Sequence, residues 1–342
     1  MTAWLTLSPL PKACRSYPLL HEQRGKNILY CVQAEINPIY PAVVHKYDFD
    51  DDSWLQLKML SPVSVSSLTS CDINDNGDKI YVMDMKRGLM TIFNLYDTND
   101  CKTEKRTIVD AITCVNTNNT AMIHNEEMHT VGGFDIFKHI KCDLKNYKCS
   151  ELHDLSGAAA NDLQELHSYG SIKTVGKWIL FGGISGSSQI DTILVYDINT
   201  KSWNTSSTKL PKAISSQGCA TISNGSIVLL FGGTEGNGEY ENDIDDIYMY
   251  RVKNGDITKL RAKCPMKGYN FRAITWTHPR NDGLLVNGWM RCKWKQCEIN
   301  HQLFPPQYLL KMIERYALTE IIDLFCARPL MHYRIEAIQL FK

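Results

Sequence analysis

The amino-acid sequence predicts an all-β fold, a single six-bladed β-propeller that covers residues 1–342. Three observations predict it. Short apolar runs recur along the chain, three of these runs end in glycine pairs spaced 50 residues apart, and a Tyr-Asp pair is twice followed by Trp at one spacing. A fixed period of roughly 20–50 residues is typical of solenoids and propellers, because each repeat is one supersecondary unit.

The glycine pairs mark the repeat most clearly. Each follows an apolar run, and the pairs are Gly132 and Gly133, Gly182 and Gly183, and Gly232 and Gly233. Glycine has no Cβ and tolerates positive φ, so we expect these pairs where neighbouring blades crowd together. The corresponding positions of the three remaining units hold Gln33-Ala34, Asp84-Met85 and Asn287-Gly288. Together these positions give six units.

A second landmark lies downstream of two of these positions. Tyr47 precedes Trp54 by seven residues, and Tyr196 precedes Trp203 by the same interval. These residues resemble the kelch repeat, in which an apolar strand ends in Gly-Gly and is followed by a Tyr-Asp strand, a Trp strand and Leu-Pro. The resemblance covers nearly the whole chain. It implies four-stranded blades of a kelch-type propeller and a scaffold that binds other proteins.

The N-terminal segment is expected to close the ring. Trp4 is followed by Leu10-Pro11-Lys12-Ala13, just as Trp203 is followed by Leu210-Pro211-Lys212-Ala213, so residues 2–8 resemble a Trp strand with no blade before it. An unpaired strand would leave an exposed sheet edge. We therefore expect residues 2–8 to be the outer strand of the last blade, with the other strands near 271–277, 283–289 and 332–341.

One helical insertion is predicted within this last blade, over residues 303–328. Pro305 and Pro306 precede a stretch whose apolar residues fall on or near one helical face: Leu309, Ile313, Tyr316, Ile321, Ile322 and Phe325. Proline suits the first turn of a helix, and an apolar stripe at this spacing is typical of one. We expect a helix over 306–326 that packs on the propeller. The alternative is a helix that docks a partner helix.

Composition argues against several classes of partner. Lys plus Arg equals Asp plus Glu at 37 each, so no net field attracts nucleic acid or an anionic membrane. The N-terminus lacks the order of a signal peptide, and no uninterrupted apolar run is long enough to span a bilayer. We expect a cytoplasmic protein. Its 12 cysteines are then expected to be buried thiols, without structural disulfides.

The candidate binding site lies in loops that join a Trp strand to the first strand of the next blade. Arg15 and Arg272 are each expected to open such a first strand, on either side of the ring closure. With Tyr17, Tyr269 and Lys267 close by, two guanidinium groups there suit a carboxylate-bearing peptide. The alternative is that each arginine is a salt-bridged loop residue. We expect a protein or peptide partner.

A partial calcium motif occurs in the second unit. Asp72, Asn74, Asn76 and Gly77 match the opening of a calcium loop, whose alternating oxygen ligands wrap a hard cation. The twelfth position is Met83, where such a loop needs a bidentate Glu. Asn-Gly also suits a tight hairpin turn, and we expect a turn here.

A loose cluster of zinc-type ligands occurs near the C-terminus. Cys292, Cys297 and His301 carry the donor atoms that zinc prefers, without an evident fourth ligand. The sequence has no nucleophile elbow, phosphate-binding loop or zinc-protease motif. We expect no metal, no cofactor and no enzymatic activity. The alternative is a metal- or base-assisted enzyme at the mouth of the propeller channel, because some kelch-fold proteins are enzymes.

Overall fold

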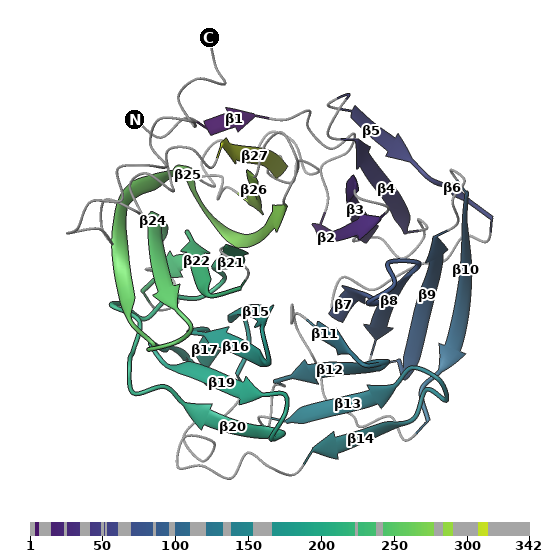
Figure 1. The fold of residues 1–342 in the computed structure, drawn as a ribbon, viewed down its shortest axis with the longest axis horizontal. Helices are drawn as coiled ribbons and strands as arrows, with labels where there is room; N and C mark the ends of the chain where they lie inside the picture. Colours follow the sequence, from purple (N-terminus) through teal and green to yellow (C-terminus); the bar gives the residue numbers. More distant parts are fainter. Residues whose placement is uncertain are drawn as a thin grey trace, which may run out of the picture.

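The structure is a computed structural model that describes residues 4–6, 15–23, 26–34, 42–48, 51, 53–60, 70–84, 87–95, 100–109, 121–132, 138–152, 166–222, 225–236, 242–276, 283–289 and 307–313. All regular elements in these ranges are β-strands, arranged as the five blades of a propeller (Figure 1). Within the same ranges no helix is long and apolar enough to cross a membrane. The all-β propeller prediction is confirmed.

Blades 1, 3 and 4 are four-stranded antiparallel sheets, and blade 2 has a fifth strand at its outer edge. The strands of each blade follow from the inner to the outer one. Blade 1 contains β2 (Arg15–Gln23), β3 (Lys26–Ala34), β4 (Val43–Asp48) and β5 (Ser53–Gln56). Blade 2 contains β7 (Ser70–Ile73), β8 (Lys79–Asp84), β9 (Leu89–Leu95) and β10 (Asp100–Thr107), with β6 (Lys58–Met59) added in parallel to β10. Blade 3 contains β11 (Ala121–His124), β12 (Glu127–Val131), β13 (His139–Asp143) and β14 (Cys149–Leu152). Blade 4 contains β15 (Gly170–Thr174), β16 (Lys177–Phe181), β19 (Ile193–Asp197) and β20 (Ser202–Thr205), and its loop forms the hairpin of β17 (Ile184–Ser185) and β18 (Ser188–Gln189).

Blade 5 is an eight-stranded sheet, and it corrects the prediction of six blades. Its strands are β21 (Gly218–Ile222), β22 (Ile227–Phe231), β23 (Thr234–Glu235), β24 (Asn242–Arg251), β25 (Ile257–Trp276), β26 (Gly283–Trp289), β27 (Gln307–Ile313) and β1 (Trp4–Thr6). The reason is β25, which is 20 residues long. It pairs with β24 up to Gly268 and with β26 from Tyr269 onward, so the predicted fifth and sixth units share one strand.

The predicted helix is wrong over the part that the structure describes. Gln307–Ile313 is strand β27, paired with β26 on one side and with β1 on the other. The third strand of the last unit is therefore β27, which lies earlier in the chain than the predicted 332–341. Residues 314–328 and 332–341 lie outside the described residues. The N-terminal strand β1 is the outermost strand of this sheet, with Trp4 opposite Met312.

The repeat landmarks correspond to defined positions in the strands. The intervals of seven residues place Tyr47 opposite Trp54 and Tyr196 opposite Trp203 on neighbouring strands. Their ring centroids lie 4.9 and 5.1 Å apart. The glycine pairs directly follow β12, β16 and β22. Gly132 and the two later pairs have positive φ, whereas Gly133 lies outside the described residues.

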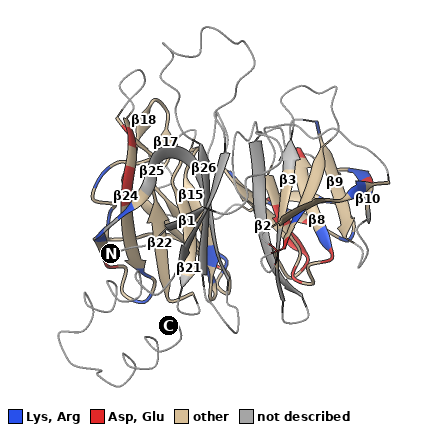
Figure 2. Cartoon of the chain, turned by 90° about the horizontal axis from the view of Figure 1, so that it is seen from above, with Lys and Arg blue, Asp and Glu red and all other residues tan. Residues whose placement is uncertain are grey.

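The hydrophobic core is divided among the blade boundaries. On β16, Trp178 and Leu180 pack with residues of blade 3, whereas Ile179 and Phe181 pack with residues of blade 5. Side chains of a strand alternate between its two faces, so this strand is buried on both. Separate clusters likewise fill the boundaries between blades 1 and 2 and between blades 2 and 3. Positions of Lys and Arg and positions of Asp and Glu both occur along the described ribbon (Figure 2).

Candidate functional site

The predicted arginine site falls at the ring closure. Arg15 and Tyr17 are in β2, and Lys267, Tyr269 and Arg272 are in the second half of β25. The strands β2 and β25 approach each other there (Figure 1). The segment around Tyr269 is part of a continuous strand instead of a loop. These five side chains lie outside the described part of the structure, so their convergence stays a prediction.

The described loops of blades 4 and 5 form one end of the ring. The segment before each inner strand pairs with the residue after the glycine pair, through bridges between His167 and Ile184 and between Ser215 and Thr234. Two backbone hydrogen bonds of 2.8 and 3.0 Å close the bridge in blade 4. We call this end, which carries the glycine pairs and the segments before the inner strands, the glycine end.

Glycine is required where these segments meet. Gly183 has φ 105°, and a Cβ there would lie 2.8 Å from the carbonyl oxygen of His167. Gly233 has φ 101°, and a Cβ there would lie 2.5 Å from the carbonyl oxygen of Ser215. Any side chain would therefore collide with backbone and strain its own φ. The paired glycines let the two bridges form.

Two serines occupy the same unusual position in consecutive blades. Ser168 has φ 54° and Ser216 has φ 58°, and each stands two residues before an inner strand. The amide of Ser216 donates to the carbonyl oxygen of Ser168 at 2.6 Å. Both serines are partly exposed, although Tyr169 and Gln217 directly after them are buried. Left-handed backbone at a residue other than glycine costs about 1–3 kcal/mol and concentrates at functional sites.

Further polar side chains border these serines. Nδ1 of His167 lies 3.1 Å from Oγ of Ser168. Gln189, at the end of β18, donates from Nε2 to the hydroxyls of two blade 5 residues at 3.0 Å each, and these are Ser215 and Thr234. The hydroxyl of Ser216 makes no hydrogen bond within the described part of the chain. We call these four residues the serine rim: His167, Ser168, Gln189 and Ser216.

The rim is anchored by hydrogen bonds that cross the blade boundaries. The hydroxyl of Tyr169 donates to the carbonyl oxygen of Val131 in blade 3 at 2.6 Å. Nε2 of Gln217 donates to the carbonyl oxygen of Phe181 in blade 4 at 2.7 Å. Tyr169 and Gln217 both precede an inner strand, and both acceptors end the second strand of the preceding blade. Equivalent hydrogen bonds at two blade boundaries therefore hold the backbone next to the rim in place.

Sequence reasoning missed the serine rim, although the sequence contains a signal for it. Ser168-Tyr169-Gly170 and Ser216-Gln217-Gly218 repeat the pattern Ser-x-Gly at an interval of 48 residues. Each pattern ends at the first residue of an inner strand. Positive φ at serine, in contrast, is not visible in a sequence, because glycine is the residue expected there.

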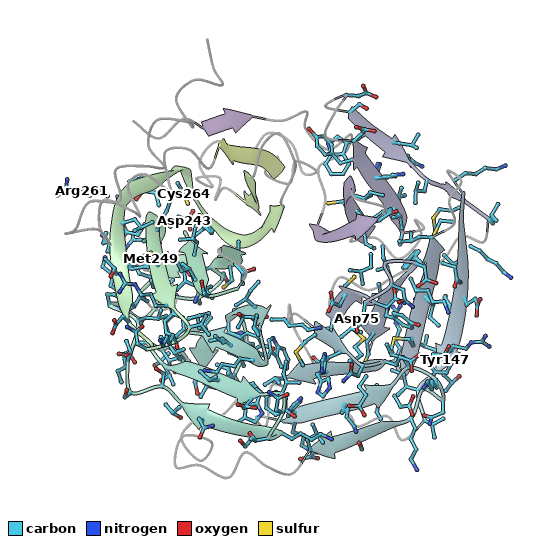
Figure 3. The ribbon with its side chains drawn as sticks, in the orientation of Figure 1. Asp75, Tyr147, Asp243, Met249, Arg261 and Cys264 are labelled. Atoms are coloured by element: carbon cyan, nitrogen blue, oxygen red, sulfur yellow. A yellow bond between two sulfur atoms is a disulfide. The ribbon has the colours of Figure 1, made fainter. Side chains whose placement is uncertain are left out.

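The opposite end of the ring carries a charged network that joins three blades. Asp72 accepts hydrogen bonds from the amides of Ile73 and Ile123, at 2.9 and 2.7 Å. Nζ of Lys173 in blade 4 donates to the carbonyl oxygen of Ile123 at 2.7 Å and lies 3.4 Å from Asp75. Figure 3 shows Asp75 toward the inner side of the ring. Burial raises the pKa of Asp72 to about 6.

The same contacts explain the partial calcium motif as a turn. Both carboxylate oxygens of Asp72 accept backbone amides. Oδ1 of Asn74 accepts the amides of Asp78 and Lys79, at 3.1 and 3.0 Å. The Asn74 oxygen closes the hairpin between β7 and β8, and the Asp72 oxygens accept amides of Ile73 and of Ile123 in blade 3, so they are not aimed at a common cation. Among the described residues no group of three or more His, Cys, Asp or Glu side chains is placed to hold a metal. Cys292, Cys297 and His301 lie outside these residues.

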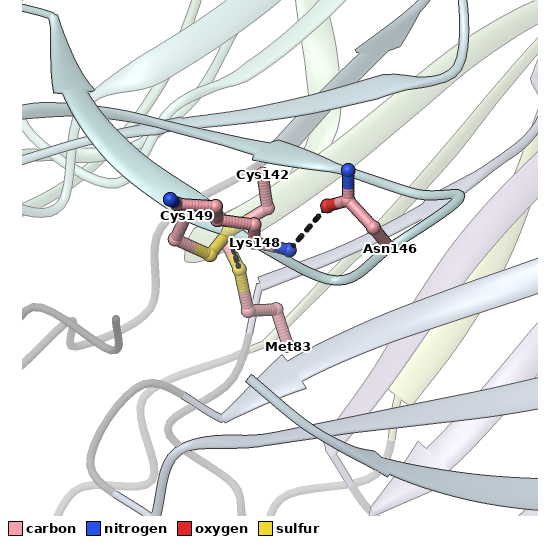
Figure 4. Close-up of a disulfide and its surroundings, with 5 residues drawn as sticks. All are labelled: Met83, Cys142, Asn146, Lys148 and Cys149. Carbon is pink, nitrogen blue, oxygen red and sulfur yellow. Dashed lines mark hydrogen bonds between the residues drawn. A yellow bond between two sulfur atoms is a disulfide. The ribbon is translucent and has the colours of Figure 1, made fainter. Parts of the chain in front are cut away.

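A disulfide corrects the expectation that the structure has none. Cys142 on β13 and Cys149 on β14 are directly opposite each other, with Cα atoms 4.0 Å apart, and the structure joins them (Figure 4). The sulfur of Cys142 lies 3.5 Å from Sδ of Met83 in blade 2. The tight turn after β13 causes this pairing, because opposite residues of an antiparallel pair bring their side chains together. Five other described cysteines are buried and are not part of a disulfide.

Comparisons with known proteins add no family to these observations. No protein-family model matches the chain, and no curated protein matches it.

Proposed function

We propose that the chain is a kelch-type scaffold without enzymatic activity that binds a protein or peptide partner at its glycine end. A propeller fold is compatible with this role, because a rigid ring can present loops in a fixed geometry. The observation that carries the proposal is the serine rim. It combines partly exposed hydroxyl, imidazole and amide groups on two adjacent blades with a costly backbone conformation at Ser168 and Ser216.

We propose that Arg15 and Arg272 contribute to binding at the same end of the ring as the serine rim. All inner strands start at this end, because each is entered from the outer strand of the preceding blade. Arg15 is the first residue of β2, and Ser168 and Ser216 stand just before β15 and β21. Hydroxyl donors together with guanidinium groups suit an acidic peptide. We propose such a peptide as the partner, bound in the cytoplasm.

Affinity capture with the full chain as bait, followed by mass spectrometry, identifies the partner. Its affinity is then measured for the double variant Ser168→Gly, Ser216→Gly. Glycine adopts φ near 55° without strain, so the fold should persist while both hydroxyls are lost. We expect affinity to fall at least about tenfold, which corresponds to the loss of roughly 1.4 kcal/mol.

Lys201→Gly is the matched control. Lys201 has φ 56° in the turn between β19 and β20, at the other end of blade 4, so the backbone change is the same. We expect the control to bind like the unchanged chain. Equal affinity of the rim variant and the control would refute binding at the rim. A parallel measurement on the double variant Arg15→Ala, Arg272→Ala tests whether the arginines contribute to binding. Unchanged affinity would show that they do not.

An enzyme at the channel mouth is the alternative function. Among the described groups, Asp72 is the best candidate for a general base. Its pKa of about 6 suits that role. Both of its oxygens, however, accept backbone amides, so a structural role explains the contacts fully. Elemental analysis of the purified full chain tests the metal-assisted form, because a stoichiometric transition metal would favour the enzyme.

A further inference from the structure

A chain of hydrogen bonds between nitrogen atoms crosses the boundary between blades 3 and 4. Nδ1 of His129 on β12 lies 2.9 Å from Nε2 of His139 on β13. Nε1 of Trp203 on β20 donates to Nδ1 of His139 at 3.2 Å. Both imidazoles are buried, with exposed fractions of 5% and 1%. The ring of Tyr196 packs against that of His139, with centroids 4.7 Å apart.

The indole fixes the direction of this chain. An indole N–H can only donate, so Nδ1 of His139 must be the acceptor and carry no proton. The proton of neutral His139 is then on Nε2, which donates to Nδ1 of His129. Neutral His129 consequently carries its own proton on Nε2, 3.8 Å from the carboxylate of Glu127. One arrangement of protons satisfies every contact, and it requires both imidazoles to be neutral.

The surroundings favour this neutral pair. Burial lowers the pKa of His129 to about 4, against the opposing influence of Glu127, and burial also lowers the pKa of His139. The titratable and charged groups around the two imidazoles are Glu127 and Lys141 of blade 3, His124 at the end of β11, and Lys201 and Tyr196 of blade 4. Lys141 and Glu127 form an ion pair of 2.6 Å, so little negative charge remains to stabilise an imidazolium.

We propose that His129, His139 and Trp203 form a proton-sensitive latch that holds blades 3 and 4 together while both imidazoles are neutral. A proton on Nδ1 of His129 would face the N–H of His139, and a proton on Nδ1 of His139 would face the indole N–H. Either event replaces a hydrogen bond by two donors that point at each other inside a buried boundary. Acid therefore opens this boundary.

The first test reads the protons directly in the unchanged full chain. Nuclear magnetic resonance of protein labelled with ¹⁵N in histidine distinguishes the two neutral tautomers and the imidazolium. At pH 7 we expect both His129 and His139 to be neutral with the proton on Nε2. We also expect both to stay neutral down to about pH 5. A proton on Nδ1 of either ring, or an imidazolium at pH 6, would overturn the latch.

The second test removes the titration and keeps the acceptor. In His129→Asn, the side-chain oxygen replaces Nδ1 as the acceptor for His139, and the residue no longer binds a proton. The unfolded histidine takes up a proton near pH 6.5 and the folded one near pH 4, so the latch loses stability as pH falls between these values. We expect the fall in melting temperature from pH 7 to pH 4.5 to be smaller in the variant by on the order of 5 °C.

His124→Asn is the control, because His124 lies at the partly exposed end of β11, on the same blade. It should show the acid response of the unchanged chain. The buried His45 of blade 1 is present in every protein compared, so its own lowered pKa cancels. Identical acid responses of His129→Asn and the control would refute the latch. If His129→Asn does not fold, the resonance measurement decides alone.

Discussion

The boundary between blades 3 and 4 and the boundary between blades 4 and 5 share one strand but differ in chemistry. Toward blade 3, β16 presents Trp178, which packs near Trp203 and His139. Toward blade 5, the same strand presents Ile179 and Phe181, which pack with aliphatic residues and tyrosines. The first boundary depends on large aromatic rings and on the protonation of two buried histidines. The second depends on aliphatic packing and on the paired glycines at its end.

Removal of the large ring of Trp178 should have the largest effect on the free energy of unfolding. Trp178 is 1% exposed, and Trp178→Ala leaves a cavity beside the imidazoles of the first boundary. We expect the free energy of unfolding to fall by about 3–5 kcal/mol, measured by urea denaturation. Ile179→Val, which faces the second boundary, should cost only about 0.5–1.5 kcal/mol. A loss below 2 kcal/mol for Trp178→Ala would show that the first boundary does not rest on its rings.

A methyl group at the glycine end of blade 5 should damage the bridge that lies beside the second boundary. Gly233→Ala adds a Cβ that meets the carbonyl oxygen of Ser215 at 2.5 Å, at a φ of 101°. We expect a loss of about 1–3 kcal/mol from backbone strain alone, again by urea denaturation. Gly186→Ala is the control, because its Cβ would meet no atom within 4 Å, although its φ of 58° carries part of the same strain. Equal losses in the two variants would mean that the close contact is unimportant.

The crossing hydrogen bonds should have the smallest effects, and they should be equal at the two boundaries. Tyr169→Phe removes the hydroxyl that donates to the carbonyl of Val131, and Gln217→Met removes the amide that donates to the carbonyl of Phe181. We expect each change to cost about 0.5–1.5 kcal/mol, because one buried hydrogen bond across a blade boundary is lost. A difference of more than 1 kcal/mol between the two would show that these equivalent positions do not share one role.

The sequence predicts the regular parts of this fold because they repeat. The spacing of Tyr47 and Trp54, and of Tyr196 and Trp203, reflects cross-strand pairs, and the glycine pairs follow second strands. The count of blades failed because nothing at Pro265 interrupts β25 in the structure. The helix failed because Gln307–Ile313 pairs on both sides, and such tertiary pairing overrides local periodicity.

The candidate site was harder to predict for a different reason. Ser168 and Ser216 share a repeated Ser-x-Gly pattern, but their left-handed backbone is a property of the folded chain. The disulfide between Cys142 and Cys149 was also missed, although a spacing of seven suits opposite positions of a hairpin. Arg15 and Arg272 were chosen by position in the repeat, and only the approach of their two strands is described.

The shared strand β25 has a consequence for how the ring unfolds. In most repeat proteins each unit contacts its neighbours through separate strands, so stability is a sum of unit terms and interface terms. Here one strand of 20 residues serves two units, and its backbone hydrogen bonds run to β24 along one half and to β26 along the other. The last two units therefore cannot melt one after the other. They form a single cooperative segment, joined to the N-terminal strand β1 through β27.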